Sequence, residues 1–454
     1  MPSHIHFGVE AALPWALYVG MFAAFFASIM WRPSIGLYVL VFALPMQTGR
    51  YKLHDFFLGP QFVDLLLAGV ILGLILRGKP AITKNSLSMF ILSFALFLYL
   101  SLWEGSFIMG APLPLWITDS RFSDWKNYVE MFVLALVTAA TIREKTQVRI
   151  LIVVMCLSVL VVNRNYYSVL AGRNLSQYSD DVRDAGMLGY AGVNGFAAFQ
   201  AMFASLLLGL YVAAKNLLVK FGLLAMLATC VYCLLFSFSR GGYVGLLVGV
   251  ITVGALQSKK YLVFALLLVI GWQVALPDSV QQRIAMTKDS GSASGQLDSS
   301  SEERIALWKD ALSLFARNPL TGTGLGTYAD MGRVGPYRDT HNYYVKVLVE
   351  TGAVGLFLFL LLLKKLIGSG LSLARSTDDH FWSSIGRAFV AMAMSGIALN
   401  VFGDRWTYQQ VDSYLWVMLG CVTAGLLRAG AGDATREVAQ QMEFDDAELE
   451  VVAE

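Results

Sequence analysis

The segment HNYYVKVLVETGAVGLFLFLLLL, residues 341–363, joins a polar start to a long apolar run. Its apolar part has about the length that a helix needs to cross roughly 30 Å of hydrocarbon, so we predict a membrane span over residues 342–363. Of the 454 residues, 56% are hydrophobic and 15% are charged, a balance that is rare among soluble proteins of this size. The chain is therefore predicted to be a polytopic membrane protein.

Apolar runs of similar length recur along the chain, without the period-two alternation of a β-barrel. We predict an all-α helical bundle with about 12–13 transmembrane helices, because one of the runs is short. The predicted spans are 12–30, 33–46, 61–77, 86–103, 127–142, 147–170, 193–214, 218–238, 241–256, 261–276, 342–363, 382–402 and 411–428.

Lysine and arginine in the short loops predict which side of the bundle faces the cytoplasm. They gather on one side of the predicted spans, at Arg77, Lys79, Lys84, Arg143, Lys145, Arg149, Lys215, Lys220, Lys259, Lys260, Lys364, Lys365 and Arg375. The predicted parts are N-terminal transmembrane helices (1–276), a large loop on the outward-facing side (277–341), C-terminal transmembrane helices (342–428) and an acidic cytoplasmic tail (429–454).

Charged residues inside the predicted spans are costly in hydrocarbon and therefore indicate cavities or partners. Seven such residues fall in the outward third or at the outward end of their helices: Asp64, Glu130, Arg164, Arg240, Glu350, Asp404 and Arg405. This one-sided distribution predicts a polar cavity open to the outside. The alternative is that each charge pairs locally or extends to the membrane surface.

Two arginines lie at the predicted starts of helices, where a bound anion would be stabilised. Arg240 stands in FSFSRGGYVG (236–245), where Gly241 and Gly242 permit a tight reversal before a helix with free N–H groups. Arg304 lies in the first turn of a predicted amphipathic helix, EERIALWKDALSLFAR (302–317), where a cation is unfavourable unless an anion is near. For Arg240, a simple hairpin turn with an interfacial arginine is the alternative.

The apolar face of that amphipathic helix is predicted to consist of Ile305, Trp308, Leu312 and Phe315. This face predicts a helix that lies along the membrane or caps the bundle. The four cysteines fall inside predicted spans, and no two histidines have the spacing of metal ligands. We expect no metal, no cofactor and no nucleic-acid partner.

Several motifs together resemble the O-antigen ligase and O-antigen polymerase superfamily. They are GVNGFAA (192–198), SRGG (239–242), the R-x-x-x-W of Arg304 and Trp308, NPLTGTGLGTY (318–328) and HNYYVKVLVETGAVG (341–355). The resemblance implies a glycosyltransferase at the periplasmic face of the bacterial inner membrane. Its donor would be a glycan on undecaprenyl pyrophosphate, and its acceptor lipid A-core or another glycan, without metal or nucleotide.

The resemblance also implies roles for individual residues. His341 matches the general base, and Arg240 and Arg304 match the arginines that bind pyrophosphate, while Asp404 matches an acidic residue near the histidine. Further residues expected around the cavity are Arg164, Tyr344, Glu350 and Arg405.

These motifs do not distinguish which member of the superfamily the chain is. The O-antigen ligase of lipopolysaccharide biosynthesis is the preferred interpretation. An O-antigen or exopolysaccharide polymerase and a protein O-oligosaccharyltransferase are alternatives, and a lipid or solute transporter is the alternative from another class. In each case, membrane lipids surround the chain.

Overall fold

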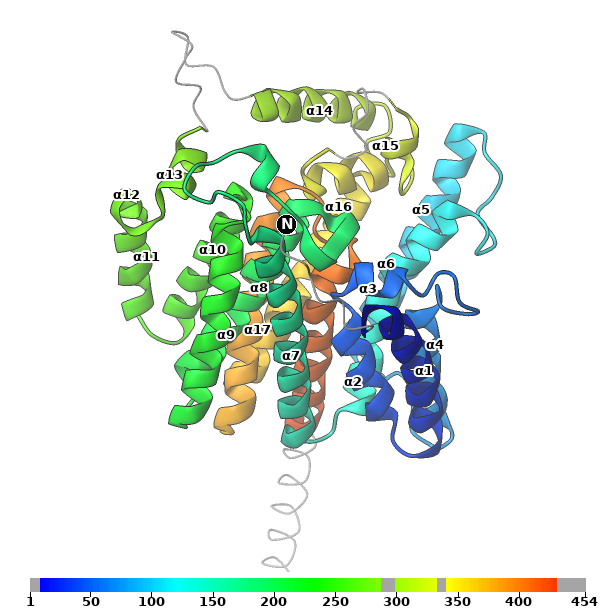
Figure 1. Ribbon diagram of the computed structural model, residues 1–454. Coiled ribbons are helices and arrows are strands. Elements are labelled where there is room, and N and C mark those ends of the chain that lie inside the picture. Colours follow the sequence, from blue (N-terminus) through cyan, green and yellow to red (C-terminus); the bar gives the residue numbers. More distant parts are fainter. Residues whose placement is uncertain (1–8, 287–298, 333–339, 431–454) are drawn as a thin grey trace, which may run out of the picture.

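The computed structural model describes residues 9–286, 299–332 and 340–430, and these residues form helices and no strands (Figure 1). This confirms the predicted all-α class. The acidic residues of the predicted tail, from Glu443 to Glu450, lie outside the described residues.

Every predicted span coincides with a helix of the structure. Seven helices are long and apolar enough to cross a membrane, and five shorter apolar helices accompany them, which makes twelve among the described residues. The thirteenth predicted span corresponds to α6 (Ser120–Thr141), whose first turns carry charged residues. The chain is thus a multi-pass membrane protein, as its composition predicts.

The N-terminal helices form a compact group at one side of the bundle (Figure 1). A Cβ atom at Gly73 would lie 2.2 Å from the Ser28 carbonyl oxygen, and one at Gly69 would lie 2.8 Å from the Phe25 ring. The missing side chains therefore let these helices approach closely. The group comprises α1 (Val9–Met30), α2 (Pro33–Ala43), the short α3 (Gln47–Tyr51) and α4 (Phe62–Ile75).

The centre of the bundle is built around α8 (Gly192–Ala213), of which most side chains are buried. It packs against α10 (Arg240–Leu256) and α17 (His380–Leu399). Gly245 of α10 faces Leu399, and Gly249 faces Ser205. This one-turn spacing of glycines brings α10 against both neighbours. The other helices around this centre are α5 (Ser86–Met109), α7 (Lys145–Leu170), α9 (Leu217–Leu235), α11 (Lys260–Ile270), α12 (Trp272–Ala275) and the C-terminal helix Gln409–Gly430.

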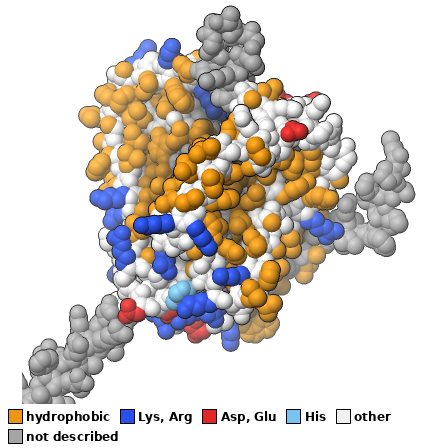
Figure 2. Space-filling view, turned by 90° about the vertical axis from the view of Figure 1, so that its left-hand side faces the viewer, with side chains coloured by type: hydrophobic (Ala, Val, Ile, Leu, Met, Phe, Trp, Pro, Cys, Tyr) orange, Lys and Arg blue, Asp and Glu red, His pale blue; other side chains and the backbone are white. Residues whose placement is uncertain are grey.

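Figure 2 shows the face of the molecule that lies on the left in Figure 1, and hydrophobic side chains cover most of it. The large apolar side chains exposed on α9 and α11 include Leu218, Phe221, Phe264 and Leu267. A surface of this kind matches the lipid-facing side of a membrane protein.

The region predicted as a large loop, 277–341, contains three helices. They are α13 (Asp278–Ala285), α14 (Ser299–Phe315) and α15 (Thr327–Asp330), and α14 lies across the end of the bundle (Figure 1). The predicted capping helix is thus present, but its predicted buried face is wrong. Leu307, Ala311 and Leu314 are buried, whereas Ile305 and Leu312 are exposed.

The helix α16 (Tyr343–Arg375) is broken near its start, where Gly352 has φ +66° and ψ −169°. The segment 319–324 fills this break with backbone hydrogen bonds. Thr323 and Gly324 donate to the carbonyls of Val349 and Glu350, and further along α16 Ala353 donates to the carbonyl of Pro319. Helix backbone groups freed by the break are satisfied in this way.

The prediction of a cytoplasmic loop directly after residue 363 is wrong, because α16 continues beyond that residue. Lys364, Lys365 and Arg375 lie within α16, which extends to Arg375, and not in a loop.

Candidate functional site

A cavity of about 460 Å³ lies where α10 begins, beneath α13 and α14. Five arginines from five separate segments line it, and the described lining residues include no acidic side chain. The arginines are Arg183, Arg240, Arg283, Arg304 and Arg405. The structure therefore brings together Arg240, Arg304 and Arg405, which were predicted from sequence, and adds two arginines that sequence reasoning missed.

The local backbone places Arg240 at the first position of α10. Phe238, two residues earlier, has φ +53°, an uncommon conformation for a residue with a side chain. Ser239 is the N-cap, and its hydroxyl accepts a hydrogen bond from the N–H of Gly242 at 3.4 Å. The predicted reversal before this helix is present, and both the helix N-terminus and the guanidinium belong to the cavity wall.

Asn194, from the GVNGFAA motif, links two parts of the cavity wall. Its side-chain oxygen accepts hydrogen bonds from the Arg183 guanidinium at 3.1 Å and from the Ser239 hydroxyl at 2.8 Å. Arg183 also lies 3.7 Å from Asp180 and donates to the Ser237 carbonyl at 3.4 Å. The start of α8 thus holds Arg183 against the turn that carries Arg240.

Arg283 is held by α13 and by an aromatic ring. Its guanidinium lies 4.7 Å from the centre of the Tyr178 ring, and its Nε donates to the Phe238 carbonyl at 3.4 Å. Burial lowers the pKa of Arg283, and the positive charges of Arg240 and Arg183 lower it further, while Tyr178 and Asp180 act in the opposite direction. The arginines therefore act on one another electrostatically, and an anion in the cavity would relieve this repulsion.

Part of the cavity wall is apolar. Val244, Leu399 and Phe402 line it together with the arginines. Planar guanidinium groups match the oxygens of phosphate in a bidentate manner, and apolar walls suit a lipid chain or a sugar face. The arrangement is suited to an anionic amphiphile.

His341 lies immediately before the start of α16, outside the lining of this cavity. Its φ is +53°, a strained conformation for a residue with a side chain. Asn342 is the N-cap of α16, and its side-chain oxygen accepts from the N–H groups of Tyr344 at 3.0 Å and Val345 at 3.3 Å. The asparagine of the His-Asn pair therefore starts the helix, and the histidine precedes it on a constrained backbone.

The helix α14 connects the histidine segment to the cavity. Arg304 lines the cavity, and one turn later the Trp308 indole donates to the Thr340 carbonyl at 2.9 Å. Residues four apart lie on one face of a helix about one turn, or roughly 5.4 Å, apart. The R-x-x-x-W motif thus ties the peptide before His341 to the helix that also carries an arginine of the cavity.

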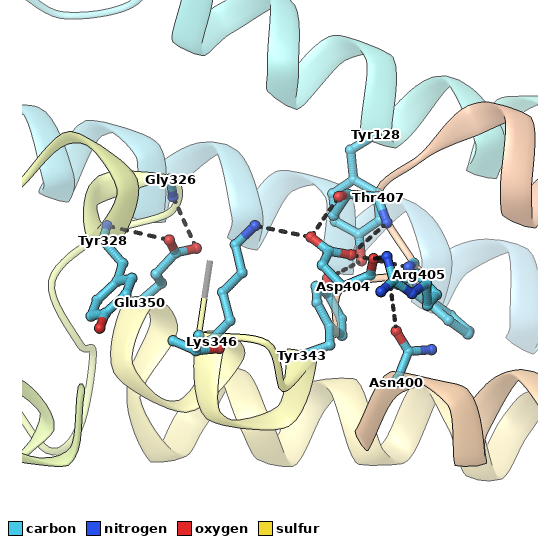
Figure 3. A network of polar contacts seen from close by, with 12 residues as sticks. Tyr128, Gly326, Tyr328, Tyr343, Lys346, Glu350, Asn400, Asp404, Arg405 and Thr407 are labelled. Carbon is cyan, nitrogen blue, oxygen red and sulfur yellow. Dashed lines mark hydrogen bonds and ion pairs between the residues drawn. The ribbon is translucent and has the colours of Figure 1, made fainter. Parts of the chain in front are cut away.

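Asp404 lies buried beside α16 and is held by several donors (Figure 3). The Lys346 ammonium group lies 2.9 Å from its carboxylate. The carboxylate also accepts hydrogen bonds from the Thr407 hydroxyl at 2.6 Å and from the Trp406 N–H at 3.0 Å. Burial alone would raise the pKa of Asp404, but Lys346 and Thr407 lower it below its usual value. The carboxylate is therefore a stable anion that fixes the first turn of α16 to the segment after α17.

Glu350 also lies outside the cavity lining, and it is buried under the glycine-rich segment 322–328 (Figure 3). Its two carboxylate oxygens accept from the N–H of Gly326 at 3.0 Å and of Tyr328 at 3.3 Å. The structure thus shows the glycine-rich segment docked on α16. Glu350 holds it there.

Two more residues expected around the cavity are placed elsewhere. The Tyr344 hydroxyl donates to the Ile397 carbonyl at 2.8 Å, which ties α16 to α17. Arg164 is exposed on α7. Neither belongs to the lining of the arginine cavity.

The remaining intramembrane acids pair locally. Lys126 lies 2.7 Å from Asp64 and 3.9 Å from Glu130, and Gln409 also donates to Glu130. For these residues, local pairing rather than a shared outward cavity is the better description. Among the residues that the structure describes, no three His, Cys, Asp or Glu side chains gather as candidate metal ligands.

Arg183 and Arg283 were missed because nothing nearby in the sequence marks them. Arg183 follows two aspartates, and Arg283 lies in a short polar stretch before a serine-rich segment. The signal that was present is the GVNGFAA motif, because its Asn194 contacts Arg183.

Comparison with known proteins agrees with these observations. A protein-family model described as O-Antigen ligase matches residues 224–360, a segment that contains Arg240, Arg283, Arg304 and His341. Comparison with the curated proteins found no match. The chain thus carries, over residues 224–360, the segment typical of the O-antigen ligase superfamily of membrane proteins.

Proposed function

We propose that this protein transfers a glycan from undecaprenyl pyrophosphate to a lipid A-core acceptor at the periplasmic face of the inner membrane, as an O-antigen ligase. The observation that supports this most strongly is the cavity lined by five arginines, three of them inside the family segment. A pyrophosphate with a lipid tail is an anionic amphiphile, the kind of ligand that such a cavity suits.

In the proposed reaction, His341 removes the proton from the acceptor hydroxyl while the oxygen attacks the anomeric carbon of the donor. The bond between that carbon and the pyrophosphate oxygen breaks, and undecaprenyl pyrophosphate leaves with the bonding electrons. Imidazole is suited to accept this proton near neutral pH. A single displacement of this kind inverts the anomeric centre.

The arginines stabilise the charge that develops on the leaving group. Arg240 and Arg304 are proposed to bind the pyrophosphate oxygens directly, with Arg405 beside them. Preorganised donors of this kind contribute most where charge develops in the transition state. They supply the stabilisation that a divalent metal gives in other pyrophosphate-dependent enzymes, so transfer is expected to persist in the presence of a chelator.

Asp404 is proposed to act as a positioning residue. It holds Lys346 in the first turn of α16, and this turn follows directly after His341. Asp404 thereby orients the end of α16 from which the histidine projects.

The decisive test is transfer by the purified full-length protein with a lipid-linked glycan and lipid A-core. We expect His341→Ala and Arg240→Ala to abolish transfer, while His380→Ala retains it, because His380 starts α17 at the other end of the bundle. Full activity of His341→Ala would refute the mechanism. Movement of the donor across the membrane without covalent change would identify a transporter.

Deletion of the gene separates ligase from polymerase. A ligase deletion leaves lipid A-core unmodified, while undecaprenyl-linked polymer of normal chain length still accumulates. Loss of the polymer itself would identify a polymerase, and loss of a glycan from proteins would identify a protein O-oligosaccharyltransferase.

A further inference from the structure

A second cavity, of about 800 Å³, lies at the opposite end of the bundle from α14. The turn between α1 and α2, the end of α4 and the turn between α6 and α7 form its walls. Four basic residues, Arg32, Arg77, Lys79 and Arg143, line it together with one acid, Glu144. This end carries the lysines and arginines that predict the cytoplasmic side.

Two of the basic residues donate hydrogen bonds to backbone carbonyls at the cavity. The Arg77 guanidinium donates to the carbonyls of Ile29 at 2.9 Å, Gly73 at 2.7 Å and Trp31 at 2.6 Å. Arg143 donates from its Nε to the Ala140 carbonyl at 3.3 Å. These bonds fix positive charge at the ends of α1 and α6, where carbonyl groups would otherwise lack partners.

Arg32 and Lys79 are placed differently. Both are exposed, and within the described part of the chain neither side chain has a hydrogen bond or an ion pair. Arg32 is also the N-cap of α2, and no side chain caps that helix start, where Ser34 and Ile35 line the cavity. Two exposed cations and a positive helix end thus line one cavity.

The rim of this cavity is apolar and exposed. Trp31, which lines it, is 71% exposed, and Leu76 next to Arg77 is 69% exposed. Ile150, on the α7 side, also lines the cavity and is exposed. Tryptophan at the level of lipid headgroups is typical of membrane interfaces, and the neighbouring side chains offer a surface for acyl chains. The shape and charge therefore match a molecule with a phosphate head and apolar chains.

We propose that this second cavity binds the headgroup phosphate of an anionic phospholipid from the leaflet at this end. The phosphate would contact Arg32 and Lys79 at the start of α2, while the acyl chains lie along Trp31 and Leu76. Basic pockets between transmembrane helices on the cytoplasmic side are suited to such headgroups. The lipid would link the N-terminal helices to the turn between α6 and α7.

The test measures phospholipid retained by the purified full-length protein in mixed micelles, by native mass spectrometry. We expect phosphatidylglycerol to be retained over phosphatidylcholine. Arg32→Gln with Lys79→Gln should weaken retention about tenfold or more, since each surface cation contributes on the order of 1 kcal/mol. The matched control is Lys215→Gln with Lys259→Gln, two exposed lysines on the same predicted side of the membrane.

Both variants keep the arginine cavity intact, so any lipid held there contributes equally to both measurements. Equal retention in the two double variants would overturn the proposal. Displacement of phosphatidylglycerol by an equal concentration of inorganic phosphate would overturn the lipid assignment, because it would mean that the site recognises the phosphate ion alone.

The acidic C-terminal segment is the other candidate occupant, since Arg428 near the end of the last helix donates to the Arg143 carbonyl at 3.5 Å. A chain that ends at residue 430 separates the two. We expect it to retain phosphatidylglycerol as the full chain does. If only the shortened chain retains the lipid, the acidic segment fills the cavity and the proposal fails.

Discussion

The arginine cavity and the start of α16 lie at the same end of the bundle, but their charges are arranged in opposite ways. Around the cavity, five arginines gather and the described lining residues include no acid. Beside α16, Asp404 faces Lys346, and Glu350 accepts two backbone N–H groups. The first arrangement concentrates positive charge around one cavity, whereas the second pairs opposite charges and satisfies a carboxylate with backbone N–H groups.

This difference separates function from stability. Substitutions in the arginine cavity should act mainly on the reaction, because like charges held together contribute little to folding. Substitutions beside α16 should act mainly on stability, because they leave a buried group without its partner.

The largest effect is expected for Arg240→Gln. Loss of one preorganised donor to the leaving pyrophosphate should lower the transfer rate by about 10²–10³-fold. The measurement is the transfer rate with purified donor and acceptor, with Arg317→Gln, an exposed arginine after α14, as the control. A rate within tenfold of the unmodified protein would contradict the assignment, and so would a loss of stability as large as that of Asp404→Asn.

Asp404→Asn should lower the free energy of unfolding by about 3 kcal/mol, since it removes the buried negative charge that lies 2.9 Å from the Lys346 ammonium group. The pKa of Asp404 is lowered in the folded protein, so the ion pair stabilises the fold above the ordinary carboxyl pKa. That contribution is lost as the pH falls through the lower folded value.

Thermal unfolding in detergent at neutral and at acidic pH measures this difference. The gap between the protein and the variant should be constant above about pH 5 and should narrow below about pH 4. Asp55→Asn, an exposed acid, is the control and should change little. A gap that widens in acid would show that the sign of the assigned pKa shift is wrong.

Gly352→Ala should destabilise the protein by about 2 kcal/mol, because only glycine adopts this backbone conformation readily. A Cβ atom there would lie 2.2 Å from the Leu320 carbonyl oxygen, so the segment 319–324 would have to move. Gly368→Ala is the matched control in the same helix, since nothing lies within 4 Å of its Cβ position. Equal melting temperatures for the two variants would contradict the role of the break.

The smallest effect is expected for Arg183→Lys. The charge is kept, but the planar contact with Asn194 is lost, so KM for the lipid-linked donor should rise about tenfold or less. Arg173→Lys is the control in the same loop, because Arg173 pairs with Asp184 outside the cavity lining. An equal rise in both variants would assign the effect to the loop and not to the cavity.

The helices were predictable because each depends on a local run of apolar residues. All thirteen predicted spans coincide with helices, and α14 was predicted as a capping helix. The buried face of α14 was not predicted correctly, because this helix has apolar residues on two sides. The segment beneath α14 determines which side is buried, since the Tyr328 hydroxyl donates to the Leu307 carbonyl.

Contacts between distant segments were only partly predictable. Arg240 and Arg304 were expected to share a cavity, and they do so. The break in α16 was invisible in sequence, because TGAVG at 351–355 continues an apolar run and its partners lie about 30 residues earlier. Glu350 was therefore expected in the cavity, although it anchors the segment that fills the break.

The segment 319–324 has a consequence for how this region tolerates change in length. Its backbone is paired in register with both sides of the break in α16, while Leu320 and Thr321 expose their side chains. Many side chains should therefore be acceptable at these two positions. An insertion or deletion of one residue would shift every pair by one step and leave the buried helix ends without partners. A stretch with the composition of an ordinary surface loop is consequently constrained in length more tightly than in sequence.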